Sequence, residues 1–109
     1  EGIYGTNVAV PAERLESASR FRERYQAAYA KEPPPYAVTT YEAMQVLLHA
    51  IEQADRPTRE GVLAAVSDME EFYGVLGRWQ FDARGDISLT TISGMQIQDG
   101  AWTFFRILE

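Results

Sequence analysis

Residues 31–43, KEPPPYAVTTYEA, separate two helical segments and decide how the chain is organised. The three prolines at 33–35 end any preceding helix, because proline has no amide hydrogen to donate and disfavours helical backbone in the residue before it. A second helix is predicted just beyond them, from about Val38 to Ala54, with Thr39 or Thr40 as its capping residue. The prolines therefore form a rigid connector between two helices.

Apolar residues on both sides of this connector recur at three- and four-residue steps, the spacing of a helix that buries one face. Upstream, this spacing predicts a helix from Pro11 to about Ala30. Downstream, the second helix is predicted to bury an apolar stripe of Tyr41, Met44, Leu47, Leu48 and Ile51.

A third, shorter helix is predicted after a break at residues 55–57. Thr58 is placed to cap it, and it should run to about Ser67. Its inward-facing residues are predicted to be Val62, Leu63 and Val66.

The periodicity changes to that of strands at both ends of the chain. Residues 3–10 are β-branched and broken by glycine, and predict a strand that ends at Pro11. Large and polar residues alternate over 78–81, and residues 87–98 are rich in Ile, Leu and Thr. Asp99-Gly100 predicts a two-residue hairpin, because both central positions of a type I′ turn require positive φ. Residues 101–108 should then form the returning strand.

The composition excludes several classes of function. Sixteen acidic residues against ten basic ones give a formal net charge of −6, which disfavours a nucleic-acid partner because phosphates are bound by Lys and Arg. The chain has no cysteine, so disulfides, thiolate metal sites and thiol nucleophiles are excluded. No segment approaches the ~20 apolar residues of a membrane span. The N-terminus lacks a signal-peptide pattern, so we expect any export signal to lie outside this sequence.

Catalytic chemistry has few candidate residues. His49 is the single histidine and lies off the apolar stripe, so we expect a surface side chain. Asp82 and Asp86 flank a tight turn that is too short for the oxygen ligands of a calcium loop. In such a turn Asp is expected to accept backbone hydrogen bonds and Gly85 to take the left-handed conformation. We therefore predict no enzyme activity, no metal site and no cofactor.

Tyr36 differs from the other aromatic residues. Phe21, Tyr25, Tyr29 and Tyr41 have helical spacing and are expected in the core, whereas Tyr36 follows the prolines and stands at a helix start. A helix N-terminus offers unpaired amides and a partial positive charge, and an aromatic ring there can wall a pocket for a small apolar or carboxylate-bearing ligand. Tyr36 is therefore the candidate ligand-binding residue.

Four short motifs follow one another along the chain, namely Tyr41-Glu42-Ala43, Gly74-Val75-Leu76-Gly77, Phe81-Asp82-Ala83-Arg84-Gly85-Asp86 and Asp99-Gly100-Ala101-Trp102. Over nearly the whole chain they resemble the C-terminal part of periplasmic solute-binding proteins of the Leu/Ile/Val (branched-chain amino-acid) type, which supply ABC importers. The family pattern has Tyr-Asp-Ala, Gly-Val-x-Gly, Phe-Asp-x-x-Gly-Asp and Asp-Gly-aromatic in that order. Glu42 departs from it by replacing the commoner Asp.

The resemblance implies a type I periplasmic-binding-protein fold, in which two α/β lobes close on an amino acid or similar solute. Residues 1–109 would be a single C-terminal segment of it, α/β in class and α+β as a fragment. Three helices would lie mainly within residues 11–68, and a small, mainly antiparallel sheet within residues 74–109. In the family the aromatic residue before the Tyr-Asp-Ala helix lines the ligand cleft, which assigns Tyr36 to that cleft.

The function implied is non-catalytic recognition of amino acids or similar small polar solutes for import. The location would be periplasmic or extracellular, with an ABC permease as partner in the full-length parent and a lipid anchor as one mode of attachment. In the family, the residues that hold the ligand's carboxylate and ammonium lie upstream of these motifs. The chain alone is therefore expected to expose apolar helix faces and to self-associate as a homo-oligomer or by domain swapping.

Two alternatives remain open at this stage. The same fold serves as a ligand-sensing domain in regulators and receptors, which a neighbouring kinase or membrane span would favour over an adjacent permease. The chain could also be a self-associating structural domain with no ligand, which oligomers without ligand-induced stabilisation would favour.

Overall fold

The structure, a computed structural model, describes residues 1–8 and 10–108. Ala9 of the expected opening strand and Glu109 at the end of the expected strand region lie outside the described residues. Along the described residues the elements are β1 (Tyr4–Asn7), the 3-10 turns η1 (Ala12–Arg14) and η2 (Glu16–Ala18), α1 (Ser19–Tyr29), α2 (Ala37–Gln53), α3 (Arg59–Ser67), β2 (Phe72–Gly74), β3 (Gly77–Trp79), β4 (Ile92–Gln98) and β5 (Ala101–Leu108).

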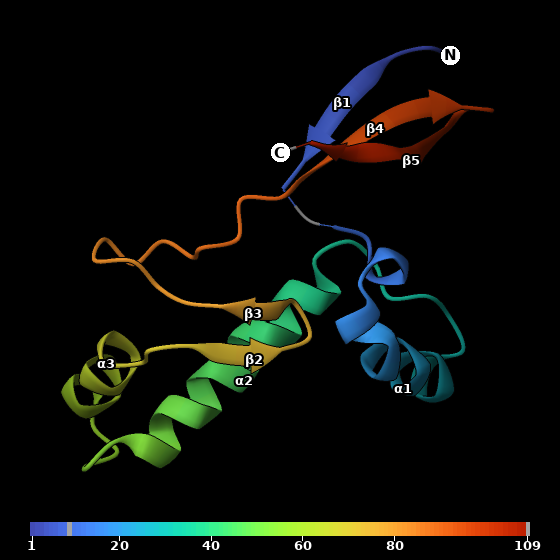
Figure 1. Ribbon diagram of the computed structural model, residues 1–109. Coiled ribbons are helices and arrows are strands. Elements are labelled where there is room, and N and C mark those ends of the chain that lie inside the picture. The colour runs from blue at the N-terminus through green and yellow to red at the C-terminus, as the bar shows by residue number, and fades with distance from the viewer. Residues whose placement is uncertain (9, 109) are drawn as a thin grey trace.

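These elements form two parts that lie one above the other in Figure 1. The first is an antiparallel sheet in the order β1–β4–β5, with β4 in the middle. The second, here called the helical body, contains η1, η2, the helices and the antiparallel β2–β3 hairpin. Three helices with small antiparallel sheets confirm the predicted mixed α/β class.

The β1–β4–β5 sheet forms in the regions that the glycine positions and the hairpin motif predicted. Asp99 and Gly100 have φ of 51° and 78°, which confirms the predicted turn between β4 and β5. A side chain at Gly5 would come within 3.0 Å of the indole ring of Trp102, so glycine lets that ring lie over β1. Strand β4 begins only at Ile92, so the strand expected from residue 87 is shorter than predicted.

The first predicted helix is interrupted. Instead of one helix from Pro11, the chain forms η1 and η2 before α1 begins at Ser19. Leu15 lies between the two turns with φ −107° and ψ 108°, an extended conformation that an α-helix cannot contain. The helix signal upstream of Ser19 therefore marked short turns.

Helix α2 matches its predicted extent within one residue, but its cap and its buried face differ from the prediction. Neither Thr39 nor Thr40 is the cap; Tyr36 is, and the Thr39 hydroxyl donates to the Tyr36 carbonyl at 2.9 Å. The buried residues of the helix are Val38, Glu42, Val46 and Ala50. Most of the predicted stripe is exposed, between 42% and 53%, and we call it the α2 apolar face: Met44, Leu47, Leu48 and Ile51.

The β2–β3 hairpin explains that difference. Strand β2 was not predicted, and strand β3 ends at Trp79, so Phe81 forms only an isolated bridge with Ile87. The hairpin turn lies against the line of α2 that contains Glu42, as the hydrogen bonds described below show. Apolar spacing alone could not predict that a carboxylate would be the buried residue.

Helix α3 confirms its predicted cap. The Gly61 amide donates to the Thr58 hydroxyl at 3.1 Å. Leu63, predicted to face inward, is 65% exposed, while Val62 and Val66 are half-buried. The helix thus contacts α2 through a narrower face than its sequence predicts.

Candidate functional site

The backbone around Tyr36 forms a tight turn into helix α2. Tyr36 has φ 69° and ψ −5°, the left-handed region that a non-glycine residue adopts uncommonly and at a cost in conformational energy. The Ala37 amide donates to the Pro34 carbonyl at 3.1 Å, and the Thr40 amide donates to the Tyr36 carbonyl at 2.9 Å. No side chain caps this helix start. The first turn therefore retains the partial positive charge of a helix N-terminus.

An ion pair between α1 and the residue before the prolines holds this turn in place. The guanidinium of Arg22 donates to both carboxylate oxygens of Glu32, at 2.8 Å from Nε and 2.7 Å from Nη2. The hydrogen bond from Arg22 holds the pKa of Glu32 below its ordinary value and raises the pKa of Arg22 in turn. The bidentate geometry fixes the connector just before Pro33.

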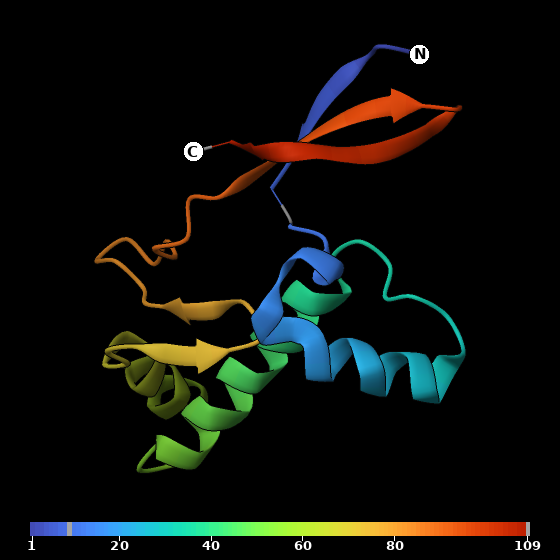
Figure 2. The same cartoon turned by 45° about the vertical axis from the view of Figure 1, so that its right-hand side comes forward.

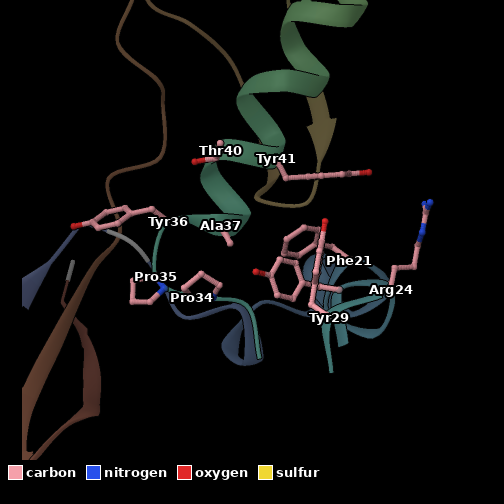
Figure 3. A pocket seen from close by; sticks show the side chains of 10 residues that line it. Phe21, Arg24, Tyr29, Pro34, Pro35, Tyr36, Ala37, Thr40 and Tyr41 are labelled. Atoms are coloured by element: carbon pink, nitrogen blue, oxygen red, sulfur yellow. The ribbon is translucent and has the colours of Figure 1, made fainter. Parts of the chain in front are cut away.

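The ring of Tyr36 points away from the Phe21, Tyr29 and Tyr41 rings (Figure 3). It extends toward the sheet, and its hydroxyl lies 3.4 Å from Oδ1 of Asn7 at the end of β1. Tyr36 is 54% exposed. The structure thus places the sequence-predicted residue at the meeting point of the sheet and the helical body.

Two hollows flank Tyr36. The first, here called the junction pocket, has a volume of about 390 Å³ and lies between the sheet and the helical body. Asn7 and Met95 line it from the sheet, and Glu13, Arg22, the three prolines, Tyr36 and Val38 line it from the helical body. Because both parts contribute walls, its shape depends on how they are arranged.

The second hollow, here called the aromatic groove, has a volume of about 640 Å³ and lies between α1 and the start of α2 (Figure 3). The rings that line it form a chain of contacts, with centroids 4.7 to 5.8 Å apart, through Phe21, Tyr25, Tyr29 and Tyr41. Phe21, Tyr25 and Tyr41 are half-buried, but Tyr29 is 62% exposed, so the core position predicted for Tyr29 is wrong.

Glu42, which departs from the family pattern, is the most informative buried polar residue. It is 2% exposed and accepts hydrogen bonds from the amides of Val75 and Leu76, at 2.9 and 3.3 Å, and from the indole Nε1 of Trp79 at 2.8 Å. Gly74 leaves the space that the carboxylate fills, because a side chain there would overlap it. The motif that contains Glu42 and the motif Gly74-Val75-Leu76-Gly77 therefore form one structural unit.

The Asp82 turn is structural, as predicted. Oδ1 of Asp82 accepts the amides of Arg84 and Asp86, at 2.8 and 3.0 Å, and Gly85 has φ 85°. The amide of Asp86, followed by that of Arg84, holds the pKa of Asp82 below its ordinary value. The carboxylate of Asp86 pairs with the exposed Arg84 at 3.5 Å.

The described structure offers little support for a catalytic or metal-binding role of His49. His49 is exposed, as predicted, and its ring lies edge-on to Phe72 with centroids 6.0 Å apart. Within residues 1–8 and 10–108, no cluster of His, Asp and Glu is suited to hold a metal ion. The described helices also include none with the length and apolar character of a membrane span.

Sequence reasoning missed Asn7 and Met95. Neither residue belongs to a motif, and each becomes part of the site only because β1 and β4 pair and bring them beside Tyr36. The alternation of β4 predicts which face Met95 occupies, but not what lies against that face.

Comparison with known proteins adds evidence beyond this geometry. Residues 1–101 match the model of a family described as periplasmic binding protein. No curated protein sequence shows significant similarity to the chain.

Solved structures match nearly the whole chain. A leucine binding protein from Thermotoga maritima is 27% identical with a TM-score of 0.79, and the match covers 99% of this chain and 31% of that one. An ABC transporter substrate-binding protein from Desulfitobacterium hafniense in complex with Leu is 25% identical with a TM-score of 0.78, over 96% of this chain and 31% of that one. A solute binding protein from R. palustris in complex with benzoate shares the fold, with 20% identity, a TM-score of 0.71 and coverage of 98% and 30%.

Proposed function

Because the chain belongs to the periplasmic binding protein family, we propose that it forms part of the solute-binding component of an ABC importer that recognises amino acids or similar small polar solutes. The match to the Leu-binding structures supports this proposal. The chain spans 31% of the length of each, so the activity of the whole protein stays a proposal. Its function would be non-catalytic and outside the cytoplasm, with an ABC permease as partner.

Tyr36 is the residue that supports this proposal most directly. Its ring borders the junction pocket, its backbone is held in a strained turn, and it precedes the start of α2, where no side chain accepts a hydrogen bond from the first-turn amides. A solute with an apolar body and a carboxylate can stack on such a ring and place its negative charge near the first-turn amides. We propose that Tyr36 forms the wall against which the solute's side chain rests, with Asn7 and Met95 on the sheet side.

A thermal-shift titration tests this proposal. L-leucine is added to the wild-type protein, to Tyr36→Ala and to Tyr73→Ala, with benzoate as a second probe. Tyr73 is a matched control, because it is an equally aromatic, 71% exposed side chain on β2 that does not line the junction pocket. We expect millimolar leucine to raise the melting temperature of the wild type and of Tyr73→Ala, and to leave that of Tyr36→Ala unchanged.

The possible results separate the site from the function. Equal stabilisation of all three proteins would remove Tyr36 from the site while keeping solute binding. No stabilisation of the wild type by either probe would contradict solute binding by this chain. Stabilisation by benzoate but not leucine would replace the amino acid with an aromatic acid as the proposed solute.

A second candidate function is a self-associating domain without a solute. The observation that favours it is the α2 apolar face, whose four residues stay 42% to 53% exposed. Proteins that expose a contiguous apolar surface commonly cover it with a partner.

A further inference from the structure

Two side-chain contacts between the sheet and the helical body have defined geometry. The hydroxyl of Tyr36 lies 3.4 Å from Oδ1 of Asn7. The guanidinium of Arg14, at the end of η1, lies over the ring of Phe104 on β5, with Cζ 4.8 Å from the ring centroid. The strand register places Asn7 and Phe104 on the same face of the sheet, so both contacts hold that face.

The Arg14 contact is the stronger of the two. An O–H···O hydrogen bond normally spans about 2.5–3.0 Å, so the Tyr36–Asn7 contact is long and weak. A guanidinium within about 6 Å of a ring centroid is attracted by the negative face of the ring. No carboxylate of the described residues pairs with Arg14, so the ring of Phe104 is its partner there.

The backbone also links the two parts. The segment that leads into β4 runs from the helical body to the sheet (Figure 2). Among the described residues, the strands of the sheet are joined by backbone hydrogen bonds to one another. Side chains at the junction therefore contribute to the angle between the sheet and the helices.

We propose that Arg14 is a positioning residue whose contact with Phe104 sets the angle between the sheet and the helical body. The same contact would set the width of the junction pocket, because both parts line that pocket. Loss of the contact would leave each part folded and free to change its angle to the other. This inference goes beyond the proposed function and does not require that any solute binds.

Electron–electron distance measurements between two spin labels test the inference. The chain contains no cysteine, so Glu52→Cys on α2 and Gln98→Cys at the tip of β4 are the only labelling sites, and both positions are exposed. The wild-type background should give one narrow distance distribution. Arg14→Ala and Phe104→Leu should each broaden it by at least half its width or shift its maximum, and the double variant should add nothing further, because both changes remove the same contact.

Controls separate positioning from loss of structure. Phe104→Trp keeps an aromatic face and should retain the narrow distance distribution. Arg20→Ala removes an exposed arginine of α1 that makes no ring contact in the described structure, and it should leave the distribution unchanged. The far-UV circular dichroism of every variant should match the wild type. An unchanged distribution in Arg14→Ala, or equal broadening in Arg20→Ala, would overturn the proposal.

Discussion

At the scale of single residues, carboxylates organise backbone in this molecule. Asp82 accepts two amides of its own turn, and its pKa is lowered because those hydrogen bonds favour the charged form. A carboxyl group whose pKa is lower in the folded than in the unfolded state stabilises the fold above its unfolded pKa. That contribution is lost as the pH falls through the folded pKa.

This sign leads to a prediction for Asp82→Asn. The variant should be less stable than the wild type at neutral pH, and the difference should shrink as the pH falls below the ordinary Asp pKa of about 3.9. Urea unfolding followed by tryptophan fluorescence, to which the buried Trp79 contributes, measures the free energy of unfolding at each pH. Asp55→Asn, an exposed acid without a hydrogen bond in the described structure, should show no such trend. A pH-independent deficit in Asp82→Asn would contradict the assignment.

At the scale of elements, α2 and the β2–β3 hairpin act as one unit through Glu42. A buried carboxylate with satisfied hydrogen bonds fixes its neighbours more strictly than apolar packing, because each unpaired amide left behind costs about 1–3 kcal/mol. The glycine at position 74 belongs to the same unit, since only a residue without a side chain leaves room for the carboxylate.

A double-mutant cycle tests that unit. Glu42→Ala should lower the free energy of unfolding by roughly 3 kcal/mol, because it leaves the Val75 and Leu76 amides and the Trp79 indole without their acceptor. Gly74→Ala should cost roughly 1–3 kcal/mol by overpacking. In the Glu42→Ala background Gly74→Ala should cost far less, because the atoms it overlaps are gone. Additive costs would show that the two residues act independently.

At the scale of the whole molecule, the described chain leaves apolar surface without cover. The α2 apolar face is exposed, as are Leu63 on α3 and Trp102 on β5. The chain is also elongated, with extents of 53 × 33 × 21 Å, and its sheet lies above the helical body in Figure 1. Such a shape buries less apolar surface than one compact body of the same length would.

We therefore predict concentration-dependent self-association through the α2 apolar face. Burying one leucine contributes about 1.5–3 kcal/mol, so Leu48→Glu should weaken association roughly tenfold or more. Light scattering coupled to size exclusion across a concentration series measures it. Gln53→Glu adds the same charge at an exposed position near the end of α2 and should leave association unchanged. A monomer at all concentrations in the wild type would refute the prediction.

Much of the architecture was predictable because it depends on local chemistry. The three prolines, the Thr58 cap and the Asp99-Gly100 turn act within a few residues, and each occurs as expected. The order of the short motifs indicated the protein family without knowledge of any contact, and the family model confirms it. The position of Tyr36 at the helix start was equally local, since the prolines hold it there, but its role as a solute contact stays a prediction.

The amino-acid sequence by itself determined α2, α3, the β4–β5 turn and the order of the family's motifs, because each depends on short stretches of neighbouring residues. Only the tertiary structure decided that Glu42 is buried, that Met44 and Leu47 are exposed, and that Arg14 lies on Phe104. Those outcomes depend on which distant segment packs against each face. Helical periodicity reports that a face is apolar, but burial is settled only when another element covers it.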